Sequence, residues 1–194
     1  MLELSSFSKY EVSGPDAETF LNRVCANRIP RRNGRIVLAH LLTENGRIEN
    51  EFTITRLAEN HFYLLSAAVS ELRDLDLLTH RLEETENVTV TNVTDAWGVL
   101  VLAGPRSRDV LAKVTDADLS NEQFRWLSAQ TIDVAGIELR ALRVNYVGEL
   151  GWELHVPMAH LEPLYDAIWA AGESSGIADF GVYAVNSMRM EKMY

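Results

Sequence analysis

The sequence has a single cysteine, Cys25, among its 194 residues, so no disulfide can form within the chain. Such a chain is typical of a reducing compartment, and no His/Asn context marks Cys25 as a nucleophile. No apolar run is long enough to span a membrane. The first residues, Met1 to Leu4, form neither a secretion signal nor a basic presequence. We therefore predict a cytoplasmic protein with a buried structural thiol and no membrane partner.

Basic residues are also scarce, because 18 Lys and Arg stand against 28 Asp and Glu, which gives a net charge of −10. A nucleic-acid backbone needs a basic surface, so a nucleic-acid partner is not expected. The five histidines form no cluster with metal-ligand spacing, which predicts no metal site. No Gly-x-Gly-x-x-Gly motif follows a strand, so dinucleotide binding of that kind is not expected.

Hydrophobic residues make up 47% of the chain, enough for a substantial core, and their periodicity predicts more strands than a helical bundle allows. The strands come in adjacent pairs, which favours an α+β fold with mainly antiparallel sheets. The predicted strands are 35–42, 48–57, 61–66, 88–93, 97–103, two strands within 132–146 split at Gly136, and a return strand through 152–156. The predicted helices follow Pro15 and Pro105 and also cover 69–82, 121–127, 161–171 and 184–193.

Two segments half a chain apart share one plan. "KYEVSGPDAETFLNRV" and "LVLAGPRSRDVLAKV" each give an apolar strand, Gly-Pro and a helix, which indicates duplicated strand–helix units. Pro15 and Pro105 suit the first helical position. Between the two segments, Asn45-Gly46 predicts a type I′ hairpin. The remaining large or charged side chains are assigned to the core (Trp97, Trp126, Trp152, Trp169) or to solvent (Arg106, Arg108).

The run from Tyr146 to Pro157 is the most informative stretch. Gly148 and Gly151 lie where a turn needs positive φ or a close backbone approach, and alternation resumes after them. This predicts a hairpin with Glu149 in the turn and Glu153 at the start of the return strand. Spacing alone favours a surface hairpin with solvated carboxylates over a functional site.

"YVGELGWELHVP" resembles the Tyr-x-Gly-Glu-x-Gly-x-Glu signature of the aminomethyltransferase (glycine-cleavage T-protein) superfamily, and its Trp-Glu-Leu continuation resembles the folate domain of dimethylglycine and sarcosine dehydrogenases. Five further stretches agree in family order, from Phe7 to Lys192: "SKYEVSGPDAETFLNRV", "LLTENGRIENEFTI", "GVLVLAGPRSRDVL", "PLYDAIWAAG" and "FGVYAVNSMRMEK". The resemblance implies that residues 1–194 are one folate-binding domain. Because the chain stops within a predicted helix, we expect a fragment that lacks the C-terminal barrel of that family.

The resemblance also implies a tetrahydrofolate site. Glu153 matches the carboxylate that binds the pterin ring, which suits bidentate pairing with an aminopyrimidine. Tyr146 is expected to stack on the pterin or hydrogen-bond it. Leu154 and His155 are expected to line the same side of the pterin site as Glu153. An arginine of the family's last helix is matched here by Val185, so that folate contact is absent. Arg189 is expected to pair with Glu191 or another carboxylate.

Asn50 is expected on an otherwise apolar strand face with Ile48, Phe52 and Ile54, so its amide needs a partner. The residues alone leave two readings open: an amide satisfied by backbone, or one that lines a ligand cavity. The resemblance places Asn50 where the transferases carry a catalytic Asp, and a neutral amide cannot take a proton near pH 7. Acid–base catalysis is therefore not expected here, although Asn50, Glu51 and Phe52 remain candidate folate contacts. Glu51 faces away on strand parity.

These implications predict a tetrahydrofolate-binding domain of a dimethylglycine or sarcosine dehydrogenase-like enzyme. It would capture a one-carbon unit derived from an N-methyl amino acid, with FAD only in an absent flavin domain in cis or in trans, and the fragment alone would be inactive. The alternatives are a non-catalytic folate-binding or assembly module, the aminomethyltransferase of glycine cleavage, or a structural half-domain without a ligand. We also expect Tyr146, Glu153 and the Asn50–Phe52 strand to line one cavity.

Overall fold

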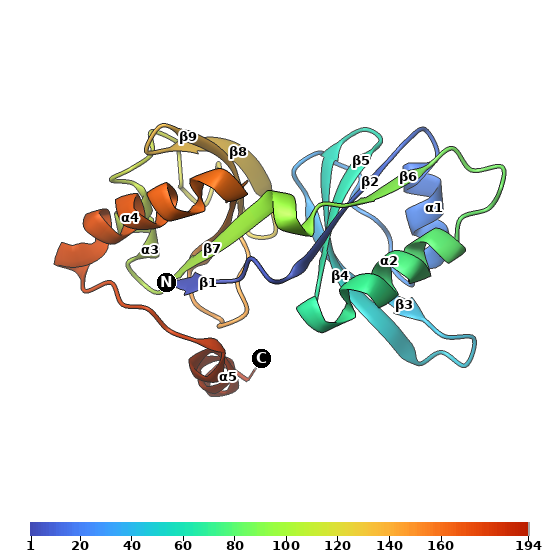
Figure 1. Ribbon diagram of the computed structural model, residues 1–194. Coiled ribbons are helices and arrows are strands. Elements are labelled where there is room, and N and C mark those ends of the chain that lie inside the picture. The colour runs from blue at the N-terminus through green and yellow to red at the C-terminus, as the bar shows by residue number, and fades with distance from the viewer. Residues whose placement is uncertain (194) are drawn as a thin grey trace. The chain divides into compact units, whose positions relative to one another are not determined.

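The computed structural model describes residues 1–193 and divides the chain into two compact units. Unit 1 comprises Met1–Ser5 together with the described residues from Asp95 onward, and unit 2 comprises Ser6–Thr94. Each unit has its own sheet and its own hydrophobic core (Figure 1). Every strand pairing in the described residues is antiparallel, which confirms the predicted α+β class with antiparallel sheets.

Unit 2 contains a five-stranded sheet in the order β3-β4-β5-β2-β6 and two helices. Its strands are β2 (Ser8–Ser13), β3 (Ile36–Leu42), β4 (Ile48–Ala58), β5 (His61–Ser66) and β6 (Thr89–Asn92). Its helices are α1 (Ala17–Val24) and α2 (Glu71–His80), which follows the 3₁₀ turn η1 (Ala68–Ser70). Both helices contribute side chains to one core cluster with the strands, so they cover the same face of the sheet.

Helix α1 packs on the sheet of unit 2 because its apolar residues recur at helical spacing. Phe20 and Leu21 of α1 are fully buried against the sheet. Phe52 of β4 lies edge-on to Tyr10 of β2, with ring centres 6.2 Å apart, an arrangement favoured for aromatic pairs. At one edge of this core, the buried Arg56 of β4 donates to the Glu18 carboxylate of α1 over 2.7 Å. The helix is therefore held by both apolar burial and one ion pair.

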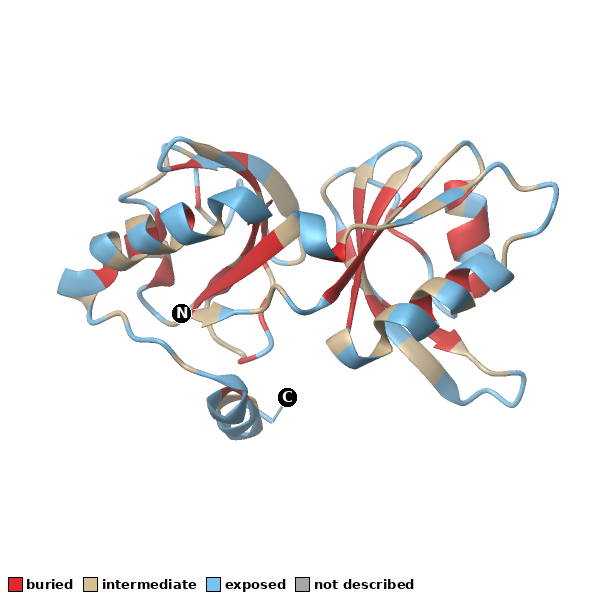
Figure 2. Ribbon diagram, viewed as in Figure 1, coloured by how far each residue is buried: buried red, intermediate tan, exposed pale blue. Residues whose placement is uncertain are grey.

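Unit 1 also contains a five-stranded sheet, in the order β1-β7-β10-β9-β8. Its strands are β1 (Leu2–Glu3), β7 (Trp97–Ala103), β8 (Ala129–Val134), β9 (Ile137–Leu142) and β10 (Gly151–Pro157). Its helices are α3 (Ser107–Leu111), α4 (Leu161–Gly172) and α5 (Val182–Glu191), and its 3₁₀ turns include η3 (Met158–His160) and η4 (Glu173–Ser175). The turn η2 (Thr94–Ala96) joins the two units along the chain. Figure 2 shows buried residues along the central strands of each unit, whereas α5 is largely exposed.

Trp152 is the largest fully buried side chain of unit 1. Its ring lies 6.0 Å from Phe124, and the guanidinium carbons of Arg108 and Arg143 lie 5.9 and 5.8 Å from its centre. The prediction that Arg108 is solvated is therefore wrong, since it contacts the core tryptophan. Trp126 is 46% exposed, so its assignment to the core is also wrong. It follows Phe124 on an irregular segment, where apolar context does not report burial.

The predicted duplication is confirmed at the level of single hydrogen bonds. Gly14 ends β2 and Gly104 ends β7, with φ of +126° and +129°. Each glycine carbonyl accepts the N–H of the first helical residue over 3.0 Å, Ala17 in one unit and Ser107 in the other. Each glycine N–H donates to the residue just before the neighbouring strand begins, Asn60 before β5 or Leu150 before β10. One strand–turn–helix design therefore occurs twice.

Three local predictions are wrong in detail. The Asn45-Gly46 hairpin forms, but of these two residues only Gly46 has positive φ, and its N–H donates to the Thr43 carbonyl. The turn is therefore type I followed by a glycine bulge, and the predicted type I′ turn is wrong. Pro15 and Pro105 precede the N-cap residues instead of opening the helices. The predicted helix 121–127 is a turn region. Leu127 has φ of +56°, which is incompatible with a right-handed α-helix.

The two equivalent glycines give a matched test of backbone strain. Gly104→Ala should lower the free energy of unfolding by about 1–3 kcal/mol, because alanine is strained at this φ although nothing lies within 4 Å of its Cβ. Gly14→Ala should cost more, because its Cβ would meet the Asn87 carbonyl oxygen at 2.3 Å. Gly181→Ala, with open space and ordinary φ, is the control. Urea unfolding followed by circular dichroism measures all three, and an equal loss at Gly14 and Gly104 would contradict the clash.

Candidate functional site

The loop that carries the signature runs between β9 and β10, which are antiparallel neighbours as predicted. Asn145 is buried and holds the loop, because its amide donates to the Glu149 carbonyl and its Oδ1 accepts the Val147 N–H over 3.0 Å. Gly148 supplies the one positive φ of the loop, +71°. Gly151 has no room for a side chain, since a Cβ would lie 2.6 Å from the Leu102 carbonyl oxygen of β7. The two glycines thus serve the two purposes that the sequence suggested.

Strand β10 presents two different faces. Trp152, Leu154 and Val156 belong to the core on the helix side of the sheet. Glu153 and His155 point to the opposite face, with 3.4 Å between a Glu153 carboxylate oxygen and His155 Nε2. The Glu153 side chain is 17% exposed and that of His155 is fully buried. The prediction that Leu154 and His155 form one wall is therefore wrong, because successive strand residues face opposite ways.

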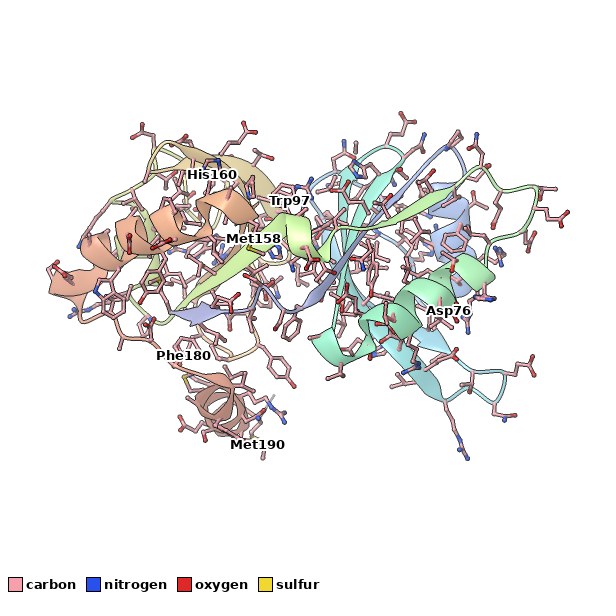
Figure 3. All side chains as sticks on the ribbon, in the orientation of Figure 1. Asp76, Trp97, Met158, His160, Phe180 and Met190 are labelled. Atoms are coloured by element: carbon pink, nitrogen blue, oxygen red, sulfur yellow. The ribbon has the colours of Figure 1, made fainter. Side chains whose placement is uncertain are left out.

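The helix-free face of the sheet in unit 1 also carries an arginine and an aromatic ring. Arg140 of β9 pairs in register with His155, and its guanidinium carbon lies 3.9 Å from the centre of the Trp97 ring. Trp97 lies at the start of β7, beside η3 with Met158 and His160 (Figure 3). This face therefore carries the Glu153 carboxylate and the buried His155 imidazole on β10, next to the Arg140 guanidinium of β9 and the Trp97 ring of β7.

Tyr146 lies on the loop and is 56% exposed. The Arg189 guanidinium of α5 is 5.3 Å from the centre of its ring, and Arg189 Nε donates to Asn186 over 3.2 Å. The expected Arg189–Glu191 pair stays a prediction. A second residue near the chain's end, Lys192, pairs with Glu149 of the same loop at 2.8 Å, and this pairing raises the pKa of Lys192. The end of α5 therefore contacts the signature loop.

A cavity of about 420 Å³ lies in unit 1, away from Glu153. It is bounded by the turn from Gly104 to Ser107, by Val147 and Glu149 of the loop, and by the segment that leads into α5. Phe180 of that segment lines it, whereas Met190 lies on α5 outside it (Figure 3). None of the predicted site residues of unit 1 lines this cavity.

In unit 2, the predicted residues 50–52 lie on β4. Asn50 pairs with Leu41, and a bulge at Glu49 shifts the register so that Ile48 is 67% exposed and leaves the apolar face. Glu51 faces the other way, as expected, and its carboxylate lies 2.7 Å from His40 Nε2. Phe52 is fully buried in the core of unit 2, so its side chain contributes packing rather than a ligand surface.

A buried carboxylate that the sequence analysis missed lies next to Asn50. Asp74 of α2 is fully buried, and burial raises the pKa of its carboxyl group, while Ser66 and Asn50 act in the opposite direction as hydrogen-bond donors. Their geometry falls short of a full hydrogen bond, because Asn50 Nδ2, Ser66 Oγ and both Asp74 oxygens lack a partner at bonding distance and angle. The signal was present in the sequence, since Asp74 precedes the core residue Leu78 by four positions on one helix face.

The residues thus fall into two sets. Tyr146, Glu153, Leu154 and His155 belong to unit 1, and Asn50, Glu51 and Phe52 belong to unit 2. Their meeting in one cavity stays a prediction. Among residues 1–193, no group of three or more His, Cys, Asp and Glu side chains has a geometry that holds a metal ion. Cys25 is buried, and burial raises the pKa of its thiol to about 12, which fits the structural role predicted for it.

The raised pKa of Asp74 has a consequence for stability. The unfolded value is about 3.9, so the folded state loses stability as pH rises from there through the higher folded pKa. Asp74→Asn should therefore raise the free energy of unfolding at pH 7, and by less at pH 4. Asp76→Asn is the control, because Asp76 lies on the exposed side of α2 (Figure 3). Urea unfolding at both pH values measures this, and an Asp74→Asn protein less stable than wild type at pH 7 would contradict it.

Comparisons with known proteins agree on one family. The family model for the GCVT N-terminal domain matches residues 1–194. Human mitochondrial dimethylglycine dehydrogenase is 39% identical over 193 residues, which is 99% of this chain and 22% of that protein. Human mitochondrial sarcosine dehydrogenase is 32% identical over 208 residues, covering 100% of this chain and 23% of that protein.

Among solved structures, the glycine cleavage system aminomethyltransferase T from Bartonella henselae superposes with a TM-score of 0.83 at 25% identity. The match covers 98% of this chain and 50% of that one. The chain spans about a fifth of the length of the curated relatives it matches. No helix in residues 1–193 is long and apolar enough to cross a membrane.

Proposed function

Since this chain belongs to the family of the GCVT N-terminal domain, we propose that it binds tetrahydrofolate and takes part in one-carbon transfer, as a folate domain of a dimethylglycine or sarcosine dehydrogenase-like enzyme. The observation that carries the proposal is Glu153. Its side chain lies mostly buried on the helix-free face of the sheet in unit 1, directly after a loop whose two glycines and Asn145 fix its backbone. Glu149, Gly151 and Glu153 lie two positions apart, which matches the Glu-x-Gly-x-Glu part of the family signature.

The residues around Glu153 fit the aminopyrimidine edge of a reduced pterin. A carboxylate accepts two parallel N–H bonds from such an edge, and partial burial strengthens both by excluding water. His155 lies 3.4 Å from the carboxylate and restricts its rotation. When bound, tetrahydrofolate supplies the nitrogen that receives the one-carbon unit. The chain's own part is to bind the pterin, orient it and limit the access of water.

Asn50 supports the dehydrogenase branch over the aminomethyltransferase of glycine cleavage. Its amide can hydrogen-bond a ligand but cannot accept a proton near neutral pH. The neighbouring Glu51 faces the other side of the sheet and pairs with His40, so it is not positioned to replace an Asp at position 50. A site of this kind holds a one-carbon acceptor and leaves the generation of that unit to another catalyst. The flavin chemistry, with FAD, would belong to a domain or subunit outside residues 1–194.

The partners and location follow from the same proposal. The one-carbon unit would derive from an N-methyl amino acid, because the relatives are named for dimethylglycine and sarcosine. Those relatives are also named mitochondrial, so the cytoplasmic location expected from the first residues remains a prediction without support from them.

The role of Glu153 can be measured directly. Glu153→Gln should weaken tetrahydrofolate binding by about 1.5–3 kcal/mol, because one acceptor of a charge-assisted pair becomes a donor. Isothermal titration calorimetry gives both affinities, and circular dichroism verifies the fold. Glu162→Gln on the exposed side of α4 is the matched control and should bind like wild type. Equal affinity of the Glu153→Gln and wild-type proteins would exclude the proposed role, and a folded wild type without affinity would refute the function.

A further inference from the structure

Three elements of unit 2 bring polar atoms together inside its core. Asn50 comes from the start of β4, Ser66 from the end of β5 and Asp74 from the buried side of α2. Four of their atoms are enclosed without a well-formed hydrogen bond: Asn50 Nδ2, Ser66 Oγ and the two Asp74 oxygens. Burial of such atoms is costly unless they satisfy one another. The arrangement therefore calls for an explanation beyond packing.

We propose that Asp74 is a positioning residue that fixes the Asn50 amide with Nδ2 toward α2, which leaves Oδ1 as the atom available to a ligand. The structure supports this because Nδ2 is the enclosed atom of a residue that is only half-buried overall. The inference rests on the proposed function for its ligand, but the orientation of the amide rests on unit 2 alone.

The chemistry permits only one orientation while Asp74 is ionised. A carboxylate accepts hydrogen bonds and donates none, and an amide NH₂ group donates and does not accept. Turning the Asn50 amide around would place its Oδ1 against the Asp74 oxygens, acceptor against acceptor in a water-poor site. The Ser66 hydroxyl of β5 lies near the same carboxylate and, like Asn50, lowers its pKa against the larger effect of burial, although neither donor forms a full hydrogen bond with it. Asp74 therefore selects which end of the Asn50 amide remains available.

The consequence is a specificity for N–H donors. The Asp that the resemblance places at this position in the transferases is also an acceptor, so Asn50 Oδ1 would reproduce the hydrogen-bonding half of such a carboxylate without its charge. The group recognised there is a neutral or weakly basic N–H, such as a pterin or amine nitrogen. A carboxylate or carbonyl oxygen would meet another acceptor and be disfavoured.

The charged and titratable groups that face Asp74 are few. Arg73 precedes it on α2 and lowers its pKa slightly through charge, against the larger effect of burial. Tyr10 of β2 is the other titratable group near it, and its hydroxyl donates to the Glu71 carbonyl over 2.7 Å. The Glu71 carboxylate accepts from Asn92 over 2.7 Å and is thereby directed to β6. No ammonium or guanidinium group of the described residues forms a salt bridge with Asp74.

The amide orientation can be tested by nuclear magnetic resonance without any ligand. In the wild-type chain, the Asn50 side-chain NH₂ resonances should shift with pH at the same midpoint as the Asp74 carboxyl carbon. Asp74→Asn should abolish that shift, because an amide partner offers both an acceptor and a donor and does not titrate. Asp76→Asn should retain it. A wild-type Asn50 amide that ignores the ionisation of Asp74 would overturn the proposal, and this wild-type result decides even if the Asp74→Asn protein fails to fold.

The ligand specificity has a separate readout. Asp74→Asn should weaken tetrahydrofolate binding about three- to tenfold, the worth of one neutral hydrogen bond, because Asn50 then populates both orientations. Asp76→Asn should bind like wild type. Unchanged affinity in Asp74→Asn would refute the effect on the ligand. A wild type without affinity would refute the proposed function and this ligand specificity with it, whereas the resonance titration would still establish or exclude the positioning role.

Discussion

The fold of each unit depends on one glycine that ends a central strand and turns the chain into a helix. Gly14 and Gly104 have φ of +126° and +129°. Each accepts a hydrogen bond from the first helical residue and donates one to the residue before the neighbouring strand. The helix that follows must then lie over the face on which the core forms. The opposite face of each sheet carries no helix of its own unit. Residues that serve a ligand can be placed there without opening the core.

Strand alternation then assigns each candidate residue to one of the two faces. In β10, Trp152 and Leu154 go to the core, and Glu153 and His155 go to the helix-free side. In β4 the candidate ligand contact lies on the other side of the sheet. Asn50 is on the helix side, next to Asp74 of α2, and Glu51 is on the helix-free side. Strand alternation therefore turns Glu153 away from the core, whereas Asn50 faces the helix side, where Asp74 is proposed to orient its amide.

Much of this could be read from the sequence, and the failures have physical causes. The strand 61–66 and the strand 97–103 were predicted with their observed bounds, because continuous apolar runs between turn residues leave little choice. The family signature located Glu153 on a return strand. Asp74 was missed because a charged residue on a helix is usually solvated, and only tertiary contact reveals the exception. Leu154 was assigned to the ligand site together with Glu153 and His155, although neighbouring residues of a strand face opposite sides of the sheet. The turn at Gly46 depends on backbone angles that the Asn-Gly pair does not determine alone.

The aromatic and thiol side chains are divided unevenly between the two units. All four tryptophans, Trp97, Trp126, Trp152 and Trp169, belong to unit 1, whereas the only cysteine, Cys25, belongs to unit 2 and is buried there. Indole fluorescence therefore reports the folding state of one unit, and thiol labelling reports that of the other. The native chain thus contains two independent spectroscopic and chemical probes, so that the order in which its halves open can be observed without an engineered label.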